Sequence, residues 1–216
     1  MLSTIHFINQ QERHGEKMRF EVIDNFLTKE QWQAQHDLVF SKKFLWSYNP
    51  KINDYSTNSD NEASFNNFKS LLFQHWFHGE GKPNSYALPH MIDDNIMFTS
   101  ASDNPDTKQP YWDIMCQPIL DKFPIKKLLN IRTNLYTWWH ETDNNSGTHR
   151  DYELGQPHLT LIYYINGSNG ATWFEGQGKI EKKANRMVIA DGKLAHRCIY
   201  QTDIEAQIAT NINIIV

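Results

Sequence analysis

From Leu128 to the end of the chain, short apolar runs alternate with turns, and no segment of helical periodicity comes between them. The runs are LNIRTNLYTWW, HLTLIYYIN, ATWFEG, NRMVIADG, LAHRCIYQ and AQIATNINIIV, with turns such as NGSNG between them. Short β-rich runs separated by turn residues are typical of strands. Several such strands in succession favour a sandwich or a barrel. We therefore predict a mainly β fold with packed helices, whose β core is a jelly roll.

The residues before this β core combine strand and helix patterns. MRFEVIDNF, which ends at Phe26, has the apolar alternation of a strand. We expect a helix to begin at Thr28, because Thr28 and Gln31 form a capping box. Another helix is predicted from about Tyr111 to Phe123, directly before the β core.

A third helix is predicted between these two. A second capping box, from Ser59 to Glu62, opens the segment EASFNNFKSLLFQHWFHG. Large apolar residues recur there at helical spacing, namely Phe65, Phe68, Leu72 and Trp76. Gly79 supplies a stop signal, so we expect the helix to end there.

The length of the chain favours one domain. It has 216 residues, and a single hydrophobic core closes within ~250 residues. We expect a single domain over residues 1–216, made of an α/β support region, 1–127, and the β core, 128–216.

Charge and cysteine content exclude several classes of protein. The chain has 21 basic and 25 acidic residues, and a net charge of -4 argues against a nucleic-acid partner. Cys116 and Cys198 lack CxxC spacing, which indicates neither a disulfide framework nor a thiolate zinc site and favours a reducing, cytoplasmic compartment. No apolar run approaches the ~18 residues of a membrane span, so we expect no membrane partner.

The stretch GTHRDYELG contains a histidine and an aspartate two residues apart, His149 and Asp151. On a strand, side chains two apart point to the same side, so both can aim at one point. His196 follows His149 by 47 residues, at the end of another strand-like run, and offers a third ligand. Two imidazoles and one carboxylate leave one side of a metal open, as non-haem Fe(II) oxygenases require. We predict that these three residues bind a metal and form the catalytic centre.

Other interpretations of these residues stay open at the level of the sequence. Zinc binds the same ligand types, although the helical HExxH pattern of zinc peptidases is absent. His158, at the start of the next strand, is an alternative ligand. His149, Asp151 and His196 can also be turn and strand-end residues whose spacing is a coincidence.

The order of HxD, a β-rich gap and a second histidine resembles the Fe(II)/2-oxoglutarate-dependent oxygenases, in particular the prolyl 4-hydroxylase-like branch and its phage-encoded members. The motifs that carry the resemblance are NLY, THRD, LTLIYYIN, NGATWF, NRMVIADGKLAH and a closing TNINI, and it covers roughly residues 128–216. The resemblance implies a double-stranded β-helix, a cupin-like jelly roll. It also implies Fe(II) on His149, Asp151 and His196, with O₂ and 2-oxoglutarate as co-substrates.

The last strand departs from the pattern of this family, in which a basic side chain, usually arginine, holds the far carboxylate of 2-oxoglutarate. Gln207 stands at that position, eleven residues after His196, and an amide does not form the charged bidentate pair of a guanidinium. Arg132 is a candidate substitute, because it lies four residues before Tyr136 and shares a face with it on a strand. Alternatively, Arg132 pairs with an acidic neighbour. The resemblance implies that Tyr136 and Tyr164 hydrogen-bond the co-substrate.

The resemblance implies a dioxygenase that hydroxylates a C–H bond of a peptide, an amino acid or a glycan. The segments 48–60 and 140–146 are expected to shape the substrate entrance. Trp138, Trp139 and Trp173 either form a substrate wall or fill the core. If the chain is encoded by a phage, its expected location is the host cytoplasm.

Two alternatives belong to other functional classes. One is a metal-holding jelly-roll binding module without 2-oxoglutarate turnover, which Gln207 supports. The other is a metal-free, virion-associated structural protein.

Overall fold

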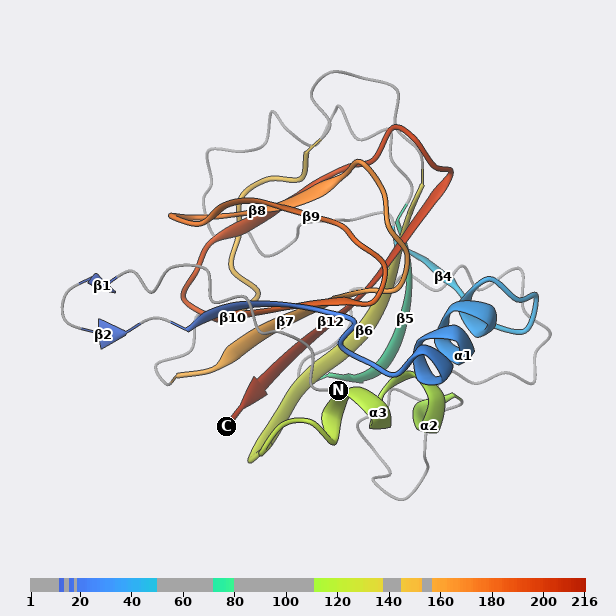
Figure 1. Ribbon diagram of the computed structural model, residues 1–216, viewed down its shortest axis with the longest axis horizontal. Coiled ribbons are helices and arrows are strands. Elements are labelled where there is room, and N and C mark those ends of the chain that lie inside the picture. The colour runs from blue at the N-terminus through green and yellow to red at the C-terminus, as the bar shows by residue number, and fades with distance from the viewer. Residues whose placement is uncertain are drawn as a thin grey trace.

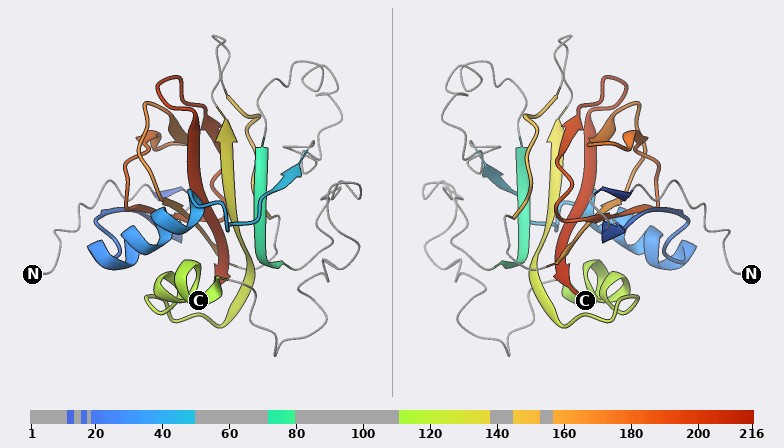
Figure 2. Two further views of the ribbon diagram at one scale, coloured as in Figure 1. Left: turned by 90° about the vertical axis from the view of Figure 1, so that its right-hand side faces the viewer. Right: turned by 90° about the vertical axis from the view of Figure 1, so that its left-hand side faces the viewer.

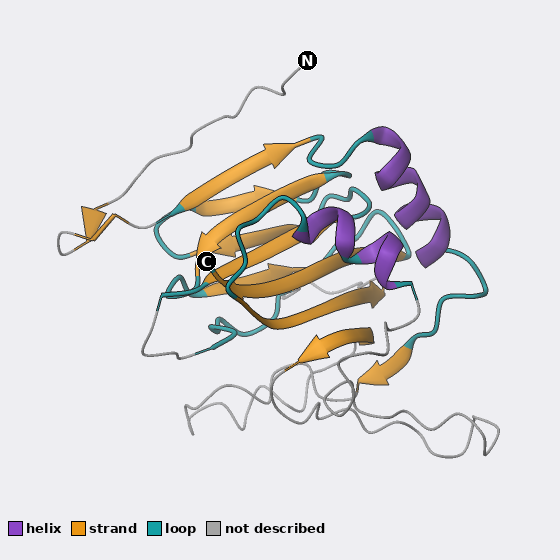
Figure 3. Ribbon diagram, turned by 90° about the horizontal axis from the view of Figure 1, so that it is seen from below, coloured by secondary structure: helices purple, strands orange, loops and turns teal. Residues whose placement is uncertain are grey.

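Two antiparallel sheets lie face to face, and the helices cover the outer face of the larger sheet (Figure 1, Figure 3). The computed structural model describes residues 12–13, 16–17, 19–49, 72–79, 111–137, 145–152 and 157–216. The predicted fold class, mainly β with packed helices, is confirmed.

The larger sheet has seven strands, and each neighbouring pair is antiparallel. Its order is β3 (Phe20–Asp24), β10 (Arg186–Asp191), β7 (Leu159–Tyr164), β12 (Ala206–Ile215), β6 (Lys127–Thr137), β5 (Leu72–Gly79) and β4 (Ser47–Asn49). Every residue of β7 is buried, as expected of a strand that is covered on both faces. Strands from both sides of residue 127 therefore share one sheet.

The smaller sheet contains β11 (His196–Ile199), β8 (Ala171–Phe174) and β9 (Gly178–Glu181), in that order. Residues 145–149 extend it, since isolated bridges join Asn145 to Ile199 and His149 to His196. From β6 onward the chain alternates between the sheets, with β7, β10 and β12 in the larger one. This alternation is the double-stranded β-helix, or jelly roll, that we predicted.

The larger sheet packs against a different core on each face. Leu161 and Tyr163 of β7 belong to the core beneath the helices, whereas Ile162 and Tyr164 belong to the core between the sheets. Successive side chains of a strand point to opposite faces, so one apolar strand serves both cores. The core between the sheets is the one that borders the candidate site.

The capping box predicted at Thr28 is present at the start of α1 (Lys29–Val39). The Gln31 amide N–H donates to Thr28 Oγ1 at 3.2 Å, and the Thr28 amide N–H donates to Gln31 Oε1 at 3.1 Å. The helix predicted near Tyr111 forms two short helices that meet at Cys116, α2 (Trp112–Met115) and α3 (Gln117–Leu120). None of the described helices has the length and apolarity needed to cross a membrane. Near the N-terminus, β1 (Glu12–Arg13) and β2 (Glu16–Lys17) form a separate hairpin.

The helix predicted up to Gly79 is wrong in the part that the structure describes. Leu72–Gly79 form β5, which runs antiparallel to β6 along the larger sheet (Figure 2). Aromatic residues suit a strand as well as a helix, and backbone pairing with the long strand β6 overrides the local helical spacing. The Ser59 capping box and residues 62–71 lie outside the described residues. The polar, Asn-rich segment LWSYNPKINDYSTNSD has the composition of a loop, and this prediction is wrong at Ser47–Asn49, where backbone pairing with β5 forms β4. The short strand β9 had no prediction.

Candidate metal centre

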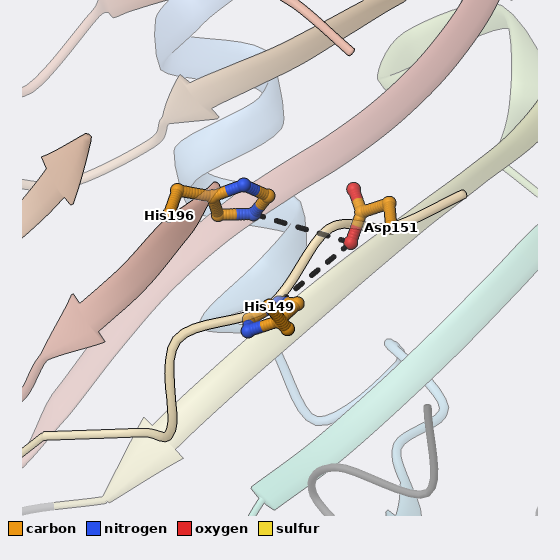
Figure 4. Close-up of side chains that lie close together, drawn as sticks. All are labelled: His149, Asp151 and His196. Atoms are coloured by element: carbon orange, nitrogen blue, oxygen red, sulfur yellow. Dashed lines mark ion pairs between the residues drawn. The ribbon is translucent and has the colours of Figure 1, made fainter. Parts of the chain in front are cut away.

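The three predicted metal ligands meet where β11 begins (Figure 4). His149 and Asp151 belong to the segment 145–152, and His196 is the first residue of β11. Each histidine donates its backbone N–H to the carbonyl oxygen of the other at 2.9 Å. This bridge closes the separation of 47 residues and leaves the two ring centroids 4.6 Å apart.

Both imidazoles turn the same nitrogen toward the carboxylate. Nε2 of His149 lies 3.8 Å and Nε2 of His196 lies 4.0 Å from Oδ1 of Asp151. Nδ1 of His149 lies 3.0 Å from the carbonyl oxygen of Gly147, and Nδ1 of His196 lies 3.4 Å from that of Leu194. Because a carbonyl oxygen only accepts, each Nδ1 donates its hydrogen, and in a neutral imidazole this tautomer leaves the lone pair on Nε2, which faces the carboxylate.

This donor set fits a divalent metal ion. One ligand atom from each of the three side chains lies within 4.8 Å of the other two. Nε2 of His196 is buried and has no hydrogen-bond partner within the described part of the chain. A buried polar atom without a partner costs about 1–3 kcal/mol, and coordination of an ion removes that cost. The alternative ligand His158 lies outside the group formed by described residues and packs edge-on against Tyr152.

The Asp151 carboxylate is buried but ionised. Burial raises its pKa, yet the charges of His196, Arg132 and His149 outweigh burial and hold the pKa below its usual range. Burial also lowers the pKa of His196 to about 4, although the charge of Asp151 acts in the opposite direction. At neutral pH the site therefore offers an anionic carboxylate and a neutral imidazole, which are the protonation states that bind metals.

Asn213 holds the carboxylate in place, a role that no motif in the sequence predicted. Its Nδ2 donates to Oδ2 of Asp151 at 2.9 Å and to Oδ1 of Asn130 at 3.2 Å. Its own Oδ1 accepts from Thr160 Oγ1 at 2.8 Å. Oδ1 of Asp151 is thereby left facing the two imidazoles. The sequence feature that indicates a buried polar role for Asn213 is its position inside the apolar run INIIV.

A pocket extends from the two histidines along the space between the sheets. Its metal end contains His149, His196, Arg132 and Asn211, and its far end contains Tyr136, Tyr164, Thr172, Lys182, Cys198 and Tyr200. The strand register sets this direction. Cys198 follows His196 by two residues on β11 and pairs with Thr172, while Tyr136 follows Arg132 by four residues on β6.

The two tyrosines that we predicted to bind a co-substrate both line this pocket. Tyr164 Oη donates to Thr172 Oγ1 at 2.7 Å. Burial raises the pKa of both tyrosines above the usual value, so both hydroxyls stay protonated. The Tyr136 ring lies beneath the Lys182 ammonium, with Nζ 5.4 Å from the ring centroid.

Of the other two residues predicted to hold the co-substrate, Arg132 lines the pocket and Gln207 does not. Arg132 lines the pocket at its metal end, where Nη2 lies 3.6 Å from Oδ1 of Asp151, as in the alternative of an acidic partner. Gln207 is buried and does not line the pocket. Its Nε2 donates to the backbone oxygen of Asn166 at 2.9 Å. A contact between Gln207 and a co-substrate therefore stays a prediction and requires this amide to change partner.

Lys182 also lines the pocket, which no motif in the sequence predicted. It is 3% exposed, and its Nζ donates to Sγ of Cys198 at 3.2 Å. It lies two residues after Ile180, a core residue of β9, so alternation along that strand points it inward. The alternation is visible in KIEK, but it becomes informative only once β9 is recognised.

Trp173 does not form a wall of this pocket. It lies between Thr172, which lines the pocket, and the core residue Phe174, so it points to the opposite face of β8. There the guanidinium carbon of Arg197 lies 4.9 Å from its ring centroid. Residues 138–144 and 50–60, including Trp138, Trp139 and most of both predicted entrance segments, lie outside the described residues.

Neither a family model nor a curated protein sequence matches the chain. A prolyl hydroxylase from Trichoplax adhaerens, solved with a hypoxia inducible factor peptide fragment, superposes with a TM-score of 0.49 at 14% identity over 89% of this chain and 82% of that chain. A viral collagen prolyl hydroxylase from Paramecium Bursaria Chlorella virus-1, solved as a 2-oxoglutarate complex, gives 0.45 at 13% identity over 91% and 96%. A prolyl-4-hydroxylase from Pseudomonas putida gives 0.44 at 10% identity over 90% and 91%.

Proposed function

We propose that this chain is an Fe(II)- and 2-oxoglutarate-dependent oxygenase of the prolyl 4-hydroxylase type. The observation that carries the proposal is the meeting of His149, Asp151 and His196 with their ligand atoms within 4.8 Å of one another. Two nitrogen atoms and one carboxylate oxygen on one side of an ion leave the opposite side for O₂ and a 2-oxo acid. Fe(II) bound there would activate O₂, which is the oxidant, and decarboxylation of 2-oxoglutarate to succinate would supply two electrons, so that one oxygen atom enters a C–H bond of the substrate.

The protein contributes ligands that are already oriented. Backbone carbonyl oxygens at 3.0 and 3.4 Å hold the rings of His149 and His196 with Nε2 turned inward. Asn213 holds Oδ2 of Asp151, so Oδ1 faces the imidazoles. Partners of this kind fix ring orientation and raise metal affinity. The same arrangement argues against the interpretation that the three ligands are a coincidence.

The pocket beside the ligands supplies donors for an acidic co-substrate. Tyr136 lines it with a hydroxyl group that burial keeps protonated, and Tyr164 donates its hydroxyl hydrogen to Thr172 at 2.7 Å, which leaves the Thr172 hydrogen for the ligand. Hydrogen bonds from such buried groups to a carboxylate are charge-assisted and strong. A peptide, an amino acid or a glycan is the substrate class that we propose.

A metal-holding binding module without 2-oxoglutarate turnover is the second candidate. The observation that favours it is Gln207, because β12, the strand that carries it, contains no basic residue. The Gln207 amide donates to the backbone oxygen of Asn166. Such a protein binds the metal and forms no succinate from 2-oxoglutarate.

An anaerobic titration tests the proposal. Metal-stripped protein receives Fe(II) and then 2-oxoglutarate, and absorbance reports the charge-transfer band of the chelate. We expect the band in the wild-type protein and its loss in the His149→Ala variant. Iron binding without the band contradicts the use of 2-oxoglutarate. A band without succinate formation after O₂ is admitted favours the binding module.

A further inference from the structure

Lys182 is a buried side chain that lacks an anionic partner among the described residues. Its side chain is almost fully buried, and within the described residues it forms no ion pair with a carboxylate. Its Nζ lies 3.2 Å from the Cys198 thiol and above the face of the Tyr136 ring. A sulfur is a weak acceptor, and a ring face compensates only part of the hydration that a buried ammonium loses.

The ammonium lies at the end of the pocket away from the metal ligands. His196 and Cys198 are two residues apart on β11 and point to the same side, a separation of ~6.7 Å along the strand. The terminal carbons of an extended five-carbon chain lie ~5 Å apart, from four C–C bonds of ~1.5 Å. A five-carbon 2-oxo dicarboxylate held at the histidines thus places its second carboxylate near Lys182.

Neutral donors surround the same end of the pocket. Thr172 accepts from Tyr164 at 2.7 Å, which leaves the hydrogen of the Thr172 hydroxyl for a ligand. A side chain is missing at Gly170, where an added Cβ would lie 3.2 Å from Nζ of Lys182 and 2.9 Å from the carbonyl oxygen of Ile199. The glycine therefore leaves room for the ammonium beside the backbone.

The other two polar candidates are placed differently. Arg132 faces the metal ligand Asp151 at 3.6 Å, at the opposite end of the pocket. Gln207 donates to Asn166 and does not line the pocket. Lys182 is thus the described cation at the far end.

We propose that Lys182 binds the far carboxylate of the 2-oxo dicarboxylate, from the smaller sheet, in place of a basic residue on the last strand. This assignment rests on the proposed function, since it takes the near end of the ligand to be held at the metal. The assignment explains why β12 can carry Gln207 where a basic residue is expected. The positive charge comes instead from Lys182, which follows β9 of the smaller sheet.

Binding titrations with two ligands test the assignment. Protein loaded with Mn(II) is titrated calorimetrically with 2-oxoglutarate and with 2-oxopentanoate, which has the same five carbons but no second carboxylate. We expect the wild-type protein to prefer 2-oxoglutarate by ~10-fold or more, the size of a hydrogen-bonded charge contact. In Lys182→Met we expect this preference to disappear, while the affinities for Mn(II) and for 2-oxopentanoate stay unchanged.

Controls keep the result specific to this residue. Lys183→Met removes the neighbouring lysine, whose side chain is 56% exposed, and is expected to keep the preference. Lys182→Arg keeps a positive charge at this position, so we expect it to retain part of the preference for 2-oxoglutarate. Thermal unfolding of each variant verifies folding, and Lys182→Gln provides a second neutral variant.

The outcomes separate the two proposals. If Lys182→Met and Lys182→Gln keep the preference for 2-oxoglutarate, the assignment of Lys182 is overturned and the proposed function stands. If wild-type protein that binds Mn(II) binds both acids equally, the far carboxylate has no anchor and the assignment is again overturned. If it binds neither acid, the proposed function fails, and the role of Lys182 fails with it.

Discussion

Nη2 of Arg132 lies 3.6 Å from Oδ1 of Asp151, the carboxylate that holds the metal in our proposal. This contact places the guanidinium at the metal end of the pocket, although Arg132 and Tyr136 share a face of β6 as predicted. We expect Arg132→Gln to retain the preference for 2-oxoglutarate over 2-oxopentanoate in the Mn(II) titration. Loss of that preference, with Mn(II) affinity unchanged, would move the carboxylate anchor from Lys182 to Arg132.

Metal binding is expected to stabilise the fold. A ligand at 100 times its Kd raises the free energy of unfolding by about 2.7 kcal/mol, which for a chain of this size corresponds to a rise in Tm of roughly 5–10 °C. Differential scanning calorimetry with Mn(II) and with a chelator measures this rise. His149→Ala should abolish it, whereas His36→Ala, on helix α1, should keep it. An equal rise in both variants would place the metal elsewhere.

Asn213→Ala is expected to lower metal affinity by ~10–100-fold, because it removes the donor that orients Asp151 at 2.9 Å. The variant also leaves Thr160 without its acceptor, so we expect it to lose about 1–2 kcal/mol of stability. Competition with a chromophoric chelator measures the affinity. Thr160→Val is the matched control, because it removes only the hydrogen bond from Thr160 to Asn213. It should keep the metal affinity of the wild type. Equal affinity in all three proteins contradicts an orienting role for Asn213.

Gly192 lies so close to the buried ring of His158 that a side chain at residue 192 requires the ring to move. A Cβ at residue 192 would lie 2.0 Å from Nε2 of His158. We expect Gly192→Ala to lower the free energy of unfolding by at least ~1–3 kcal/mol, the range for overpacked cores. Denaturant unfolding measures it. The double variant Gly192→Ala, His158→Ala should be less destabilised than the sum of the single variants, and simple additivity would disprove the clash.

The two cysteines should differ in reactivity. Cys116 is fully buried, and burial raises the pKa of its thiol above the usual value, so it should resist alkylation in the native protein. Cys198 is partly exposed and lines the pocket. Mass spectrometry after iodoacetamide treatment is expected to show label on Cys198 first. With Mn(II) present, 2-oxoglutarate should slow that labelling, and an unchanged rate places the ligand away from the far end of the pocket.

Local patterns in the sequence were sufficient for the features that depend on neighbouring residues. The Thr28 capping box requires only Thr28 and Gln31, and the structure contains it. The strand-like runs after Leu128 recur as β6, β7, β8, β10, β11 and β12. His149 and Asp151 converge as their spacing predicted, but not on a continuous strand, because His149 forms an isolated bridge to His196 and Asp151 lies in a bend after it.

Tertiary structure decided the features that depend on distant pairing. Residues 72–79 carry aromatic side chains that suit either a helix or a strand, and the backbone of β6 selected the strand. Lys182 became a pocket residue only because β9 folds against β8, which turns the ammonium toward Cys198. Asn213 and Arg132 reached Asp151 across two strands of the larger sheet. A sequence records which side chains alternate on a strand, but the register between strands far apart in the chain is set by packing, and that register determines which polar groups meet.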